Sequence, residues 1–269
     1  MLRKTLVAGL SLAWVLSLAG VAHAGPVYNW NWSAGDAGAV SNAGGTINWI
    51  QSEFDTNNNT LSWYVNFGSV PYRPWLRTEA FTLALNNGPN PKGHAGELAI
   101  FYFDTTKSSP ILTAYGYNGR NDTTSHRDGS RDQAGDQTPD RLGSSLDSGA
   151  NSWVHDLTFD TESNGSRTMG FSIDVTDILG HTPLYPETGP WHGTGYDSKI
   201  GVWMHSFAGM RTSYNDHYVN RWDRNKEGWL DLSNEDTDVT QPVPEPSTLA
   251  LVGLGLVGSA LVRRRRRSA

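Results

Sequence analysis

The sequence predicts an all-β protein, an antiparallel β-sandwich with jelly-roll-like connections. Its composition is rich in Gly, Asn, Ser, Thr and aromatic residues, with 29 glycines and 11% aromatics, which is typical of strands joined by turns. Apolar and polar residues alternate in short runs, as they do in strands that have one buried face. The sequence contains no heptads, long amphipathic helices or convincing internal repeats.

An N-terminal signal peptide is predicted over residues 1–24. Arg3 and Lys4 form a basic start, an apolar stretch follows, and Ala22-His23-Ala24 is a small-residue cleavage site before Gly25. This pattern predicts export and cleavage by signal peptidase.

The β-sandwich body is expected to span residues 25–232, with about eight to ten strands. The strand-like runs lie at residues 46–51, 61–67, 79–85, 97–103, 111–117, 153–159, 168–175 and 199–207. The run 97–103 is almost wholly apolar, which predicts a central strand covered on both faces. The Asn-rich residues 55–59 predict a hairpin loop, and residues 174–180 predict one short helical turn closed by Gly180.

Two segments of the body carry a resemblance. The stretch from Phe81 to Asp104, followed by the stretch from Leu112 to Gly119, is similar to a pattern shared by exported bacterial proteins. It is also distantly similar to the DOMON and family-9 carbohydrate-binding sandwiches. This likeness concerns the strand pattern, and it implies the fold without assigning an activity or ligand residues.

The C-terminal 27 residues, 243–269, form a short motif, an apolar run and a cationic stop. A polar, acidic linker is expected before them at residues 233–242. The motif consists of Val243, Pro244, Glu245 and Pro246. The run Thr248–Val262 carries no charge over 15 residues. As a helix it would be roughly 22 Å long, short of the ~30 Å hydrocarbon core, which predicts a weak membrane helix. The stop consists of Arg263, Arg264, Arg265, Arg266 and Arg267, which are expected to stay cytoplasmic.

This tail resembles the PEP-CTERM sorting signal of Gram-negative bacteria, which is also described as an ice-binding-protein C-terminal motif. The resemblance implies recognition by an exosortase-type membrane protease at the Pro-Glu-Pro motif. It further implies a transient inner-membrane anchor, followed by release to the cell surface or to an extracellular polysaccharide matrix.

The charge balance limits the partners of the body. The chain has 21 basic and 27 acidic residues, of which seven basic residues and one glutamate lie in the two ends. The body therefore keeps 14 basic and 26 acidic residues, a net charge of −12. An acidic body argues against binding to nucleic acid or anionic lipid. The absence of cysteine excludes disulfides and thiol chemistry.

The polar segment 117–152 has only two large apolar residues, Leu142 and Leu146, and is long for a loop within a domain. Four of its aspartates follow one another at intervals of four residues: Asp128, Asp132, Asp136 and Asp140. Their oxygens could hold a Ca²⁺ ion, although the spacing fits no EF-hand. The alternative is a solvated loop whose arginines pair with these aspartates.

Aromatic clusters in polar surroundings suggest sugar contacts, because an indole ring stacks well on the apolar face of a pyranose. The candidate residues are Trp30, Trp32, Trp75, Trp191 and Trp222. The alternative is that these rings pack in the core or along its edges, as aromatic residues commonly do in β-sandwiches.

The sequence thus predicts an exported surface or matrix protein, with polysaccharide binding as the leading activity for the body. The alternatives are a secreted glycan-active enzyme and a purely structural surface component. The sequence has no Gly-x-Ser-x-Gly motif, and its histidines form no metal-binding motif. For a glycosidase, Glu97 would be the first carboxylate to inspect.

Overall fold

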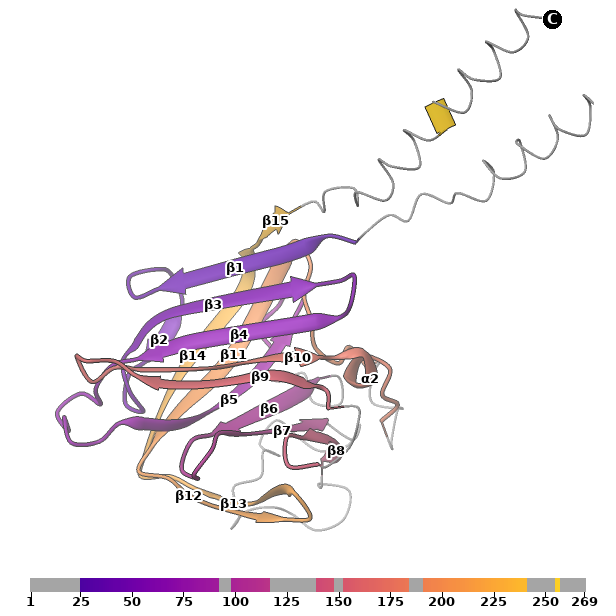
Figure 1. Ribbon diagram of the computed structural model, residues 1–269. Coiled ribbons are helices and arrows are strands. Elements are labelled where there is room, and N and C mark those ends of the chain that lie inside the picture. Colours follow the sequence, from indigo (N-terminus) through magenta and orange to yellow (C-terminus); the bar gives the residue numbers. More distant parts are fainter. Residues whose placement is uncertain are drawn as a thin grey trace, which may run out of the picture. The chain divides into compact units, whose positions relative to one another are not determined.

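The computed structural model describes residues 25–91, 98–116, 139–147, 152–183, 191–240 and 255–256. Residues 26–240 form one compact unit built from two antiparallel sheets and a separate hairpin (Figure 1). The first sheet has the order β15 (Asp238–Thr240), β1 (Val27–Ser33), β3 (Ile47–Asp55), β4 (Thr60–Phe67), β10 (Arg167–Asp174) and β9 (Val154–Thr161). We call it the six-stranded sheet.

The second, seven-stranded sheet contains a meander of four strands that follow one another in sequence. Its order is β2 (Ala39–Ser41), β14 (Lys226–Asp236), β11 (Lys199–Ala208), β5 (Thr78–Asn86), β6 (Ala99–Asp104), β7 (Ile111–Gly116) and β8 (Asp140–Ser144). The hairpin consists of β12 (Arg211–Asn215) and β13 (Tyr218–Asp223). The all-β antiparallel prediction is confirmed, and the jelly-roll-like connectivity stays a prediction.

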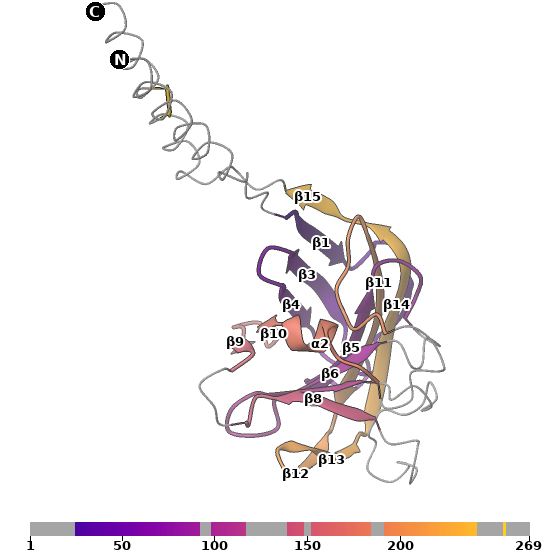
Figure 2. The same ribbon diagram turned by 90° about the vertical axis from the view of Figure 1, so that its right-hand side faces the viewer.

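The main core lies between the two sheets, which face each other in Figure 2. Strand β4 shows how the sequence builds it, because its alternate residues Leu61, Trp63 and Val65 are all fully buried. They meet residues of the opposite sheet, including Phe81 of β5 and Phe101 of β6. The period-2 pattern of the sequence therefore sets which face of each strand enters the core.

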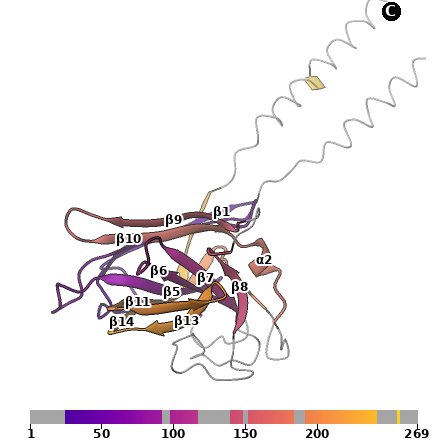
Figure 3. The same cartoon turned by 60° about the horizontal axis from the view of Figure 1, so that its bottom comes forward.

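A second core covers the outer face of the seven-stranded sheet. There the hairpin β12–β13 packs on the sheet, and β13 is seen beside the sheet in Figure 3. Trp222 of β13 lies edge-on to Tyr102 of β6, with ring centroids 5.2 Å apart. Strands β5, β6 and β7 are consequently buried along almost their whole length. This arrangement confirms that the apolar run around Phe101 is a strand covered on both faces.

The short helical turn is also confirmed, as α2 (Thr176–Leu179), with Gly180 following. The Asp174 carboxylate accepts a hydrogen bond from the Thr176 backbone N–H at 2.8 Å. The hydrogen bonds to Thr176 lower the pKa of Asp174. The turn places Leu179 and the Ile178 carbonyl at one end of the sandwich.

The expected polar linker at residues 233–242 is wrong over most of its length. Ser233 to Asp236 continue β14, and Lys199 of β11 donates to Asp236 at 2.6 Å. Residues 238–240 form β15, which pairs with β1 at the edge of the six-stranded sheet. Backbone hydrogen bonds to neighbouring strands hold this acidic stretch in place. Because such bonds do not require apolar side chains, the sequence shows no alternating pattern that would predict these strands. The folded body therefore ends at Thr240.

Candidate functional site

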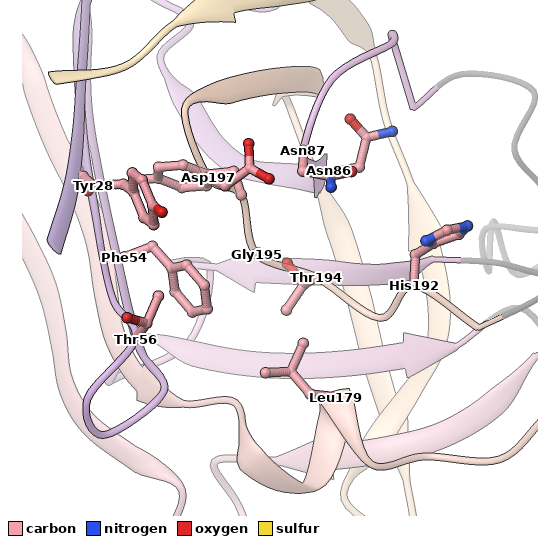
Figure 4. Close-up of a pocket in the computed structure, with 11 residues that line it drawn as sticks. Tyr28, Phe54, Thr56, Asn86, Asn87, Leu179, His192, Thr194, Gly195 and Asp197 are labelled. Carbon is pink, nitrogen blue, oxygen red and sulfur yellow. The ribbon is translucent and has the colours of Figure 1, made fainter. Parts of the chain in front are cut away.

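A cleft of about 330 Å³ opens at one end of the sandwich. It is formed by the start of β1, the ends of β3 and β5, helix α2 and the segment before β11 (Figure 4). Its lining residues are Tyr28, Phe54, Thr56, Asn86, Asn87, Leu179, His192, Thr194, Gly195, Tyr196 and Asp197. We call this site the end cleft.

Aromatic rings form the floor of the end cleft. The rings of Phe54 and Tyr196 lie 5.8 Å apart and are both almost fully buried. Gly195 has a positive φ of 109°, and a Cβ there would lie 3.0 Å from the Phe54 ring. Glycine is therefore needed for this segment to pass close to the ring.

A buried hydroxyl ties the floor to the six-stranded sheet. Tyr196 donates a hydrogen bond to Ser52 Oγ at 2.9 Å. Burial raises the pKa of Tyr196, against the opposing effect of the bond to Ser52. The phenol is thus neutral at physiological pH, and it positions the segment from residue 194 to residue 197.

The rim of the end cleft is polar. Asn87 and His192 are exposed, and Figure 4 shows His192 across the cleft from Phe54 and Thr56. The Asp197 carboxylate accepts a hydrogen bond from the Lys199 backbone N–H at 3.1 Å. Amide, imidazole, hydroxyl and carboxylate groups therefore surround an aromatic floor.

The end cleft lacks a pair of facing carboxylates among its described residues, since Asp197 is the one acidic side chain in its lining. Glycosidases of the common kind need two carboxylates flanking the scissile bond. Glu97, the carboxylate singled out in the sequence, lies outside the described residues.

Three of the five tryptophans predicted to contact sugar are buried. Trp30 and Trp32 lie in the main core, where Trp30 stacks on Trp63 with centroids 5.8 Å apart. Trp222 is fully buried beneath the hairpin. For these three the packing alternative holds, because a buried ring has no face left for a ligand.

The other two tryptophans differ from each other. Trp191 is partly buried, its Nε1 donates to the Ile178 carbonyl at 2.8 Å, and its ring lies edge-on to His181. Trp75 is 73% exposed, in the loop between β4 and β5. Its neighbour Tyr72 is 99% exposed, at a positive φ of 59°. Of the predicted set, Trp75 alone offers a free ring surface.

The predicted calcium ligands are only partly within the described chain. Asp128, Asp132 and Asp136 lie outside it, whereas Asp140 begins β8 and contacts His181 at 3.0 Å. The described residues contain no group of three or more acidic or histidine side chains arranged to hold a metal ion. Asp140 therefore has a protein partner, and the other three positions stay a prediction.

A second histidine–carboxylate pair involves Glu227 on β14. His205 Nδ1 lies 2.6 Å from Glu227 Oε1, and Arg224 Nε donates to Glu227 Oε2 at 2.5 Å. Burial opposes ionisation, but the hydrogen bond from His205 and the charge of Arg224 lower the pKa of Glu227 to about 2. Glu227 is therefore a carboxylate held ionised inside the fold.

The residues of the end cleft were not predicted from the sequence. They come from five separate stretches of chain, and only the fold brings Tyr28, Asn87 and His192 together. The period-2 pattern does place Tyr28 and Phe54 on the inward faces of strands, where they pair in register. This alternation was the feature of the sequence that could have indicated part of the end cleft.

Comparison with known proteins identifies the C-terminal tail. Residues 242–267 match the PEP-CTERM protein-sorting motif, so this chain carries that motif. No curated protein matches the chain. One solved structure, from a study of pH-induced modulation of Streptococcus parasanguinis adhesion by fimbriae, aligns at 11% identity. It covers 81% of this chain and 94% of its own, at a TM-score of 0.24, which is too low to support any argument.

The described residues contain no helix that is long and apolar enough to span a membrane. The predicted signal peptide lies outside the described residues. The C-terminal apolar run does as well, apart from Gly255 and Leu256, which are helical.

Proposed function

We propose that this protein is an exported surface or matrix protein whose body binds polysaccharide without cleaving it. The PEP-CTERM motif supports export and sorting to the surface. In this proposal signal peptidase removes residues 1–24, and an exosortase-type protease acts at Val243 to Pro246. Residues 248–262 would anchor the chain transiently in the inner membrane, with the five arginines on the cytoplasmic side.

The end cleft is the observation that carries the binding proposal. Carbohydrate sites combine an apolar surface for ring C–H groups with polar groups that bond hydroxyls. The partly exposed ring of Tyr28 supplies the first, and the side chains of Asn87, His192 and Asp197 supply the second. With a single described carboxylate in the lining, the cleft supports recognition of a neutral sugar better than its hydrolysis.

Affinity electrophoresis of the processed protein through gels that contain polysaccharides tests the proposal. The wild type should be retarded by at least one neutral polysaccharide, and Asn87→Ala and His192→Ala should each restore most of its mobility. Asn220→Ala, an exposed asparagine on the hairpin, is the matched control and should behave as wild type. Trp75→Ala tests whether the exposed loop ring contributes as well.

Two results would count against the proposal. The first is normal mobility of the wild type in every polysaccharide. The second is the release of new reducing ends during incubation, which would indicate a glycan-active enzyme.

A further inference from the structure

A polar groove of about 270 Å³ crosses the outer face of the six-stranded sheet, on the opposite side of that sheet from the main core. Two rows of outward side chains cross β1, β3 and β4 in register. The first row runs from Asn31 through Gln51 to Tyr64. The second row runs from Asn29 through Glu53 to Ser62. We call this site the sheet groove.

The Tyr64 ring lies against a glycine of the neighbouring strand. Gly170 of β10 is directly opposite Tyr64, and a Cβ on Gly170 would lie 2.4 Å from the Tyr64 ring. The missing side chain lets the ring rest on the β10 backbone while it stays partly exposed. An aromatic ring seated in this way offers a flat apolar surface at the end of the first row.

Several polar side chains of the sheet groove are available to a ligand. Asn31, Gln51 and Glu53 make no side-chain hydrogen bond within the described part of the chain, whereas Asn29 bonds Thr240 at 3.2 Å. Ser62 donates to Ser172 Oγ at 3.0 Å, and this bond joins the second row to β10. The groove therefore presents amide and carboxylate groups that a bound molecule could satisfy.

The charge around Tyr64 is negative. Glu53 is the diagonal neighbour of Tyr64 across β3 and β4, and Asp156 of β9 continues the second row beyond Ser172 of β10. Burial raises the pKa of Tyr64, and the charges of Asp156 and Glu53 raise it further. The six strands of this sheet contain no lysine and a single arginine, Arg167. Arg167 donates to the Thr78 carbonyl of the other sheet at 2.8 Å, so its charge points away from the groove.

These features limit which kind of ligand the sheet groove can bind. An anionic chain would meet uncompensated carboxylates, and the described residues contain no cluster able to hold a metal ion. A protonated amine suits Glu53, whose carboxylate makes no hydrogen bond within the described chain, and it is attracted to the face of an aromatic ring. A flat sugar ring suits the surface of Tyr64, and hydroxyls suit Asn31 and Gln51.

We propose that the sheet groove binds an amino-sugar polysaccharide with free amines, stacking one pyranose on Tyr64 and placing its ammonium group beside Glu53. The inference requires export of the body, but it is independent of the end cleft. The two sites lie on different parts of the sandwich, so one body could join two polysaccharide chains.

Retention of the full chain, in mild detergent at pH 6, on chitosan beads tests this inference, with chitin and alginate beads beside them. Chitosan carries free amines, chitin carries acetylated ones and alginate carries carboxylates. We expect strong retention on chitosan only. Tyr64→Ala and Glu53→Gln should each weaken the retention roughly tenfold.

The body has a net charge of −12, so the control must separate recognition from general attraction to a polycation. Asp216→Asn removes one negative charge from the turn of the hairpin, at a positive φ of 47° that asparagine tolerates. Its retention should equal that of the wild type. His192→Ala in the end cleft should also leave chitosan retention unchanged, which distinguishes the two sites.

Three outcomes would overturn the inference. One is equal weakening by Asp216→Asn and Glu53→Gln, and another is equal retention of the His192→Ala variant, whose end cleft is impaired, on chitin and chitosan. The third is full retention of both Tyr64→Ala and Glu53→Gln. Because Glu53 is exposed and makes no hydrogen bond within the described chain, its variant should keep the wild-type melting temperature even if Tyr64→Ala does not fold.

Discussion

A hydrogen bond from Tyr214 to the buried carboxylate of Asp104 connects the hairpin β12–β13 to the seven-stranded sheet, and Tyr214→Phe tests how much this bond stabilises the fold. Tyr214 Oη donates a hydrogen bond to Asp104 Oδ2 at 2.6 Å, and Asp104 is fully buried at the end of β6. Burial and the Asp104 charge raise the pKa of Tyr214, so the phenol stays a donor. The other Asp104 oxygen accepts from the Thr106 backbone N–H at 2.8 Å.

The expected loss can be estimated from this geometry. Tyr214→Phe keeps the ring, so it leaves no cavity, but it removes one hydrogen bond to a buried charged group. Such bonds contribute about 1.5–3 kcal/mol. Because Asp104 keeps its bond from Thr106, we expect the free energy of unfolding to fall by about 2 kcal/mol. In a body of this size the melting temperature should fall by about 4–8 °C.

Urea unfolding followed by tryptophan fluorescence measures this loss, with Tyr115→Phe as the matched control. Tyr115 Oη donates to the neutral Val219 carbonyl of the same hairpin at 2.9 Å. Its removal should cost about 1 kcal/mol, the usual value for a neutral hydrogen bond. The reasoning is refuted if Tyr214→Phe costs no more than Tyr115→Phe.

Four further outcomes are expected. Gly44→Ala should lower the free energy of unfolding by at least about 2 kcal/mol in urea titration, because the new Cβ would lie 2.0 Å from the Ser206 carbonyl oxygen. Gly68→Ala is the control: the nearest atom to its new Cβ is 3.4 Å away, so it should lower the free energy of unfolding less. The folded-state pKa of Glu227, about 2, lies below its ordinary value of 4.5, so its stabilisation is complete above pH 4.5 and is lost as the pH falls toward 2. This contribution is at most about 3 kcal/mol, and Glu227→Gln should flatten that part of the stability–pH curve; an unchanged acid limb would contradict the pairing. If the four aspartates of the predicted calcium loop bind Ca²⁺, EDTA should lower the melting temperature, whereas equal melts with and without EDTA would exclude it. Mass spectrometry of the mature protein should show that the five C-terminal arginines have been removed, and an intact tail in every mature form would indicate a lasting anchor.

Strands that contribute to the main core were predictable because their side chains alternate. The runs around Trp63 and Phe101 became β4 and β6, and the Asn-rich stretch between β3 and β4 became their hairpin loop. The same rule explains the error at Trp30 and Trp32. These residues alternate with Asn29 and Asn31, which is the period of a strand, and both indoles point into the core.

The parts that the sequence did not reveal depend on contacts between distant segments. Trp222 has polar neighbours because β13 covers a sheet with one face and meets solvent with the other. The end cleft contains residues from both sheets. The Tyr64 ring packs against the backbone at Gly170, which is more than 100 positions away in the chain. No local pattern marks such a pairing, because either residue alone is unremarkable on a strand.

The pairing of β15 with β1 also determines how the body would bear mechanical load. Val27 lies opposite Thr240, so the predicted signal-peptide cleavage site and the sorting motif each lie within a few residues of the same strand pair. The chain before Thr240 belongs to β14 in one sheet and to β15 in the other. If the C-terminal anchoring proposed above is correct, a pull on that end would load β15 in the six-stranded sheet first and β14 in the seven-stranded sheet after it. Hydrogen bonds between strands would carry that load, because the cysteine-free sequence cannot form disulfides.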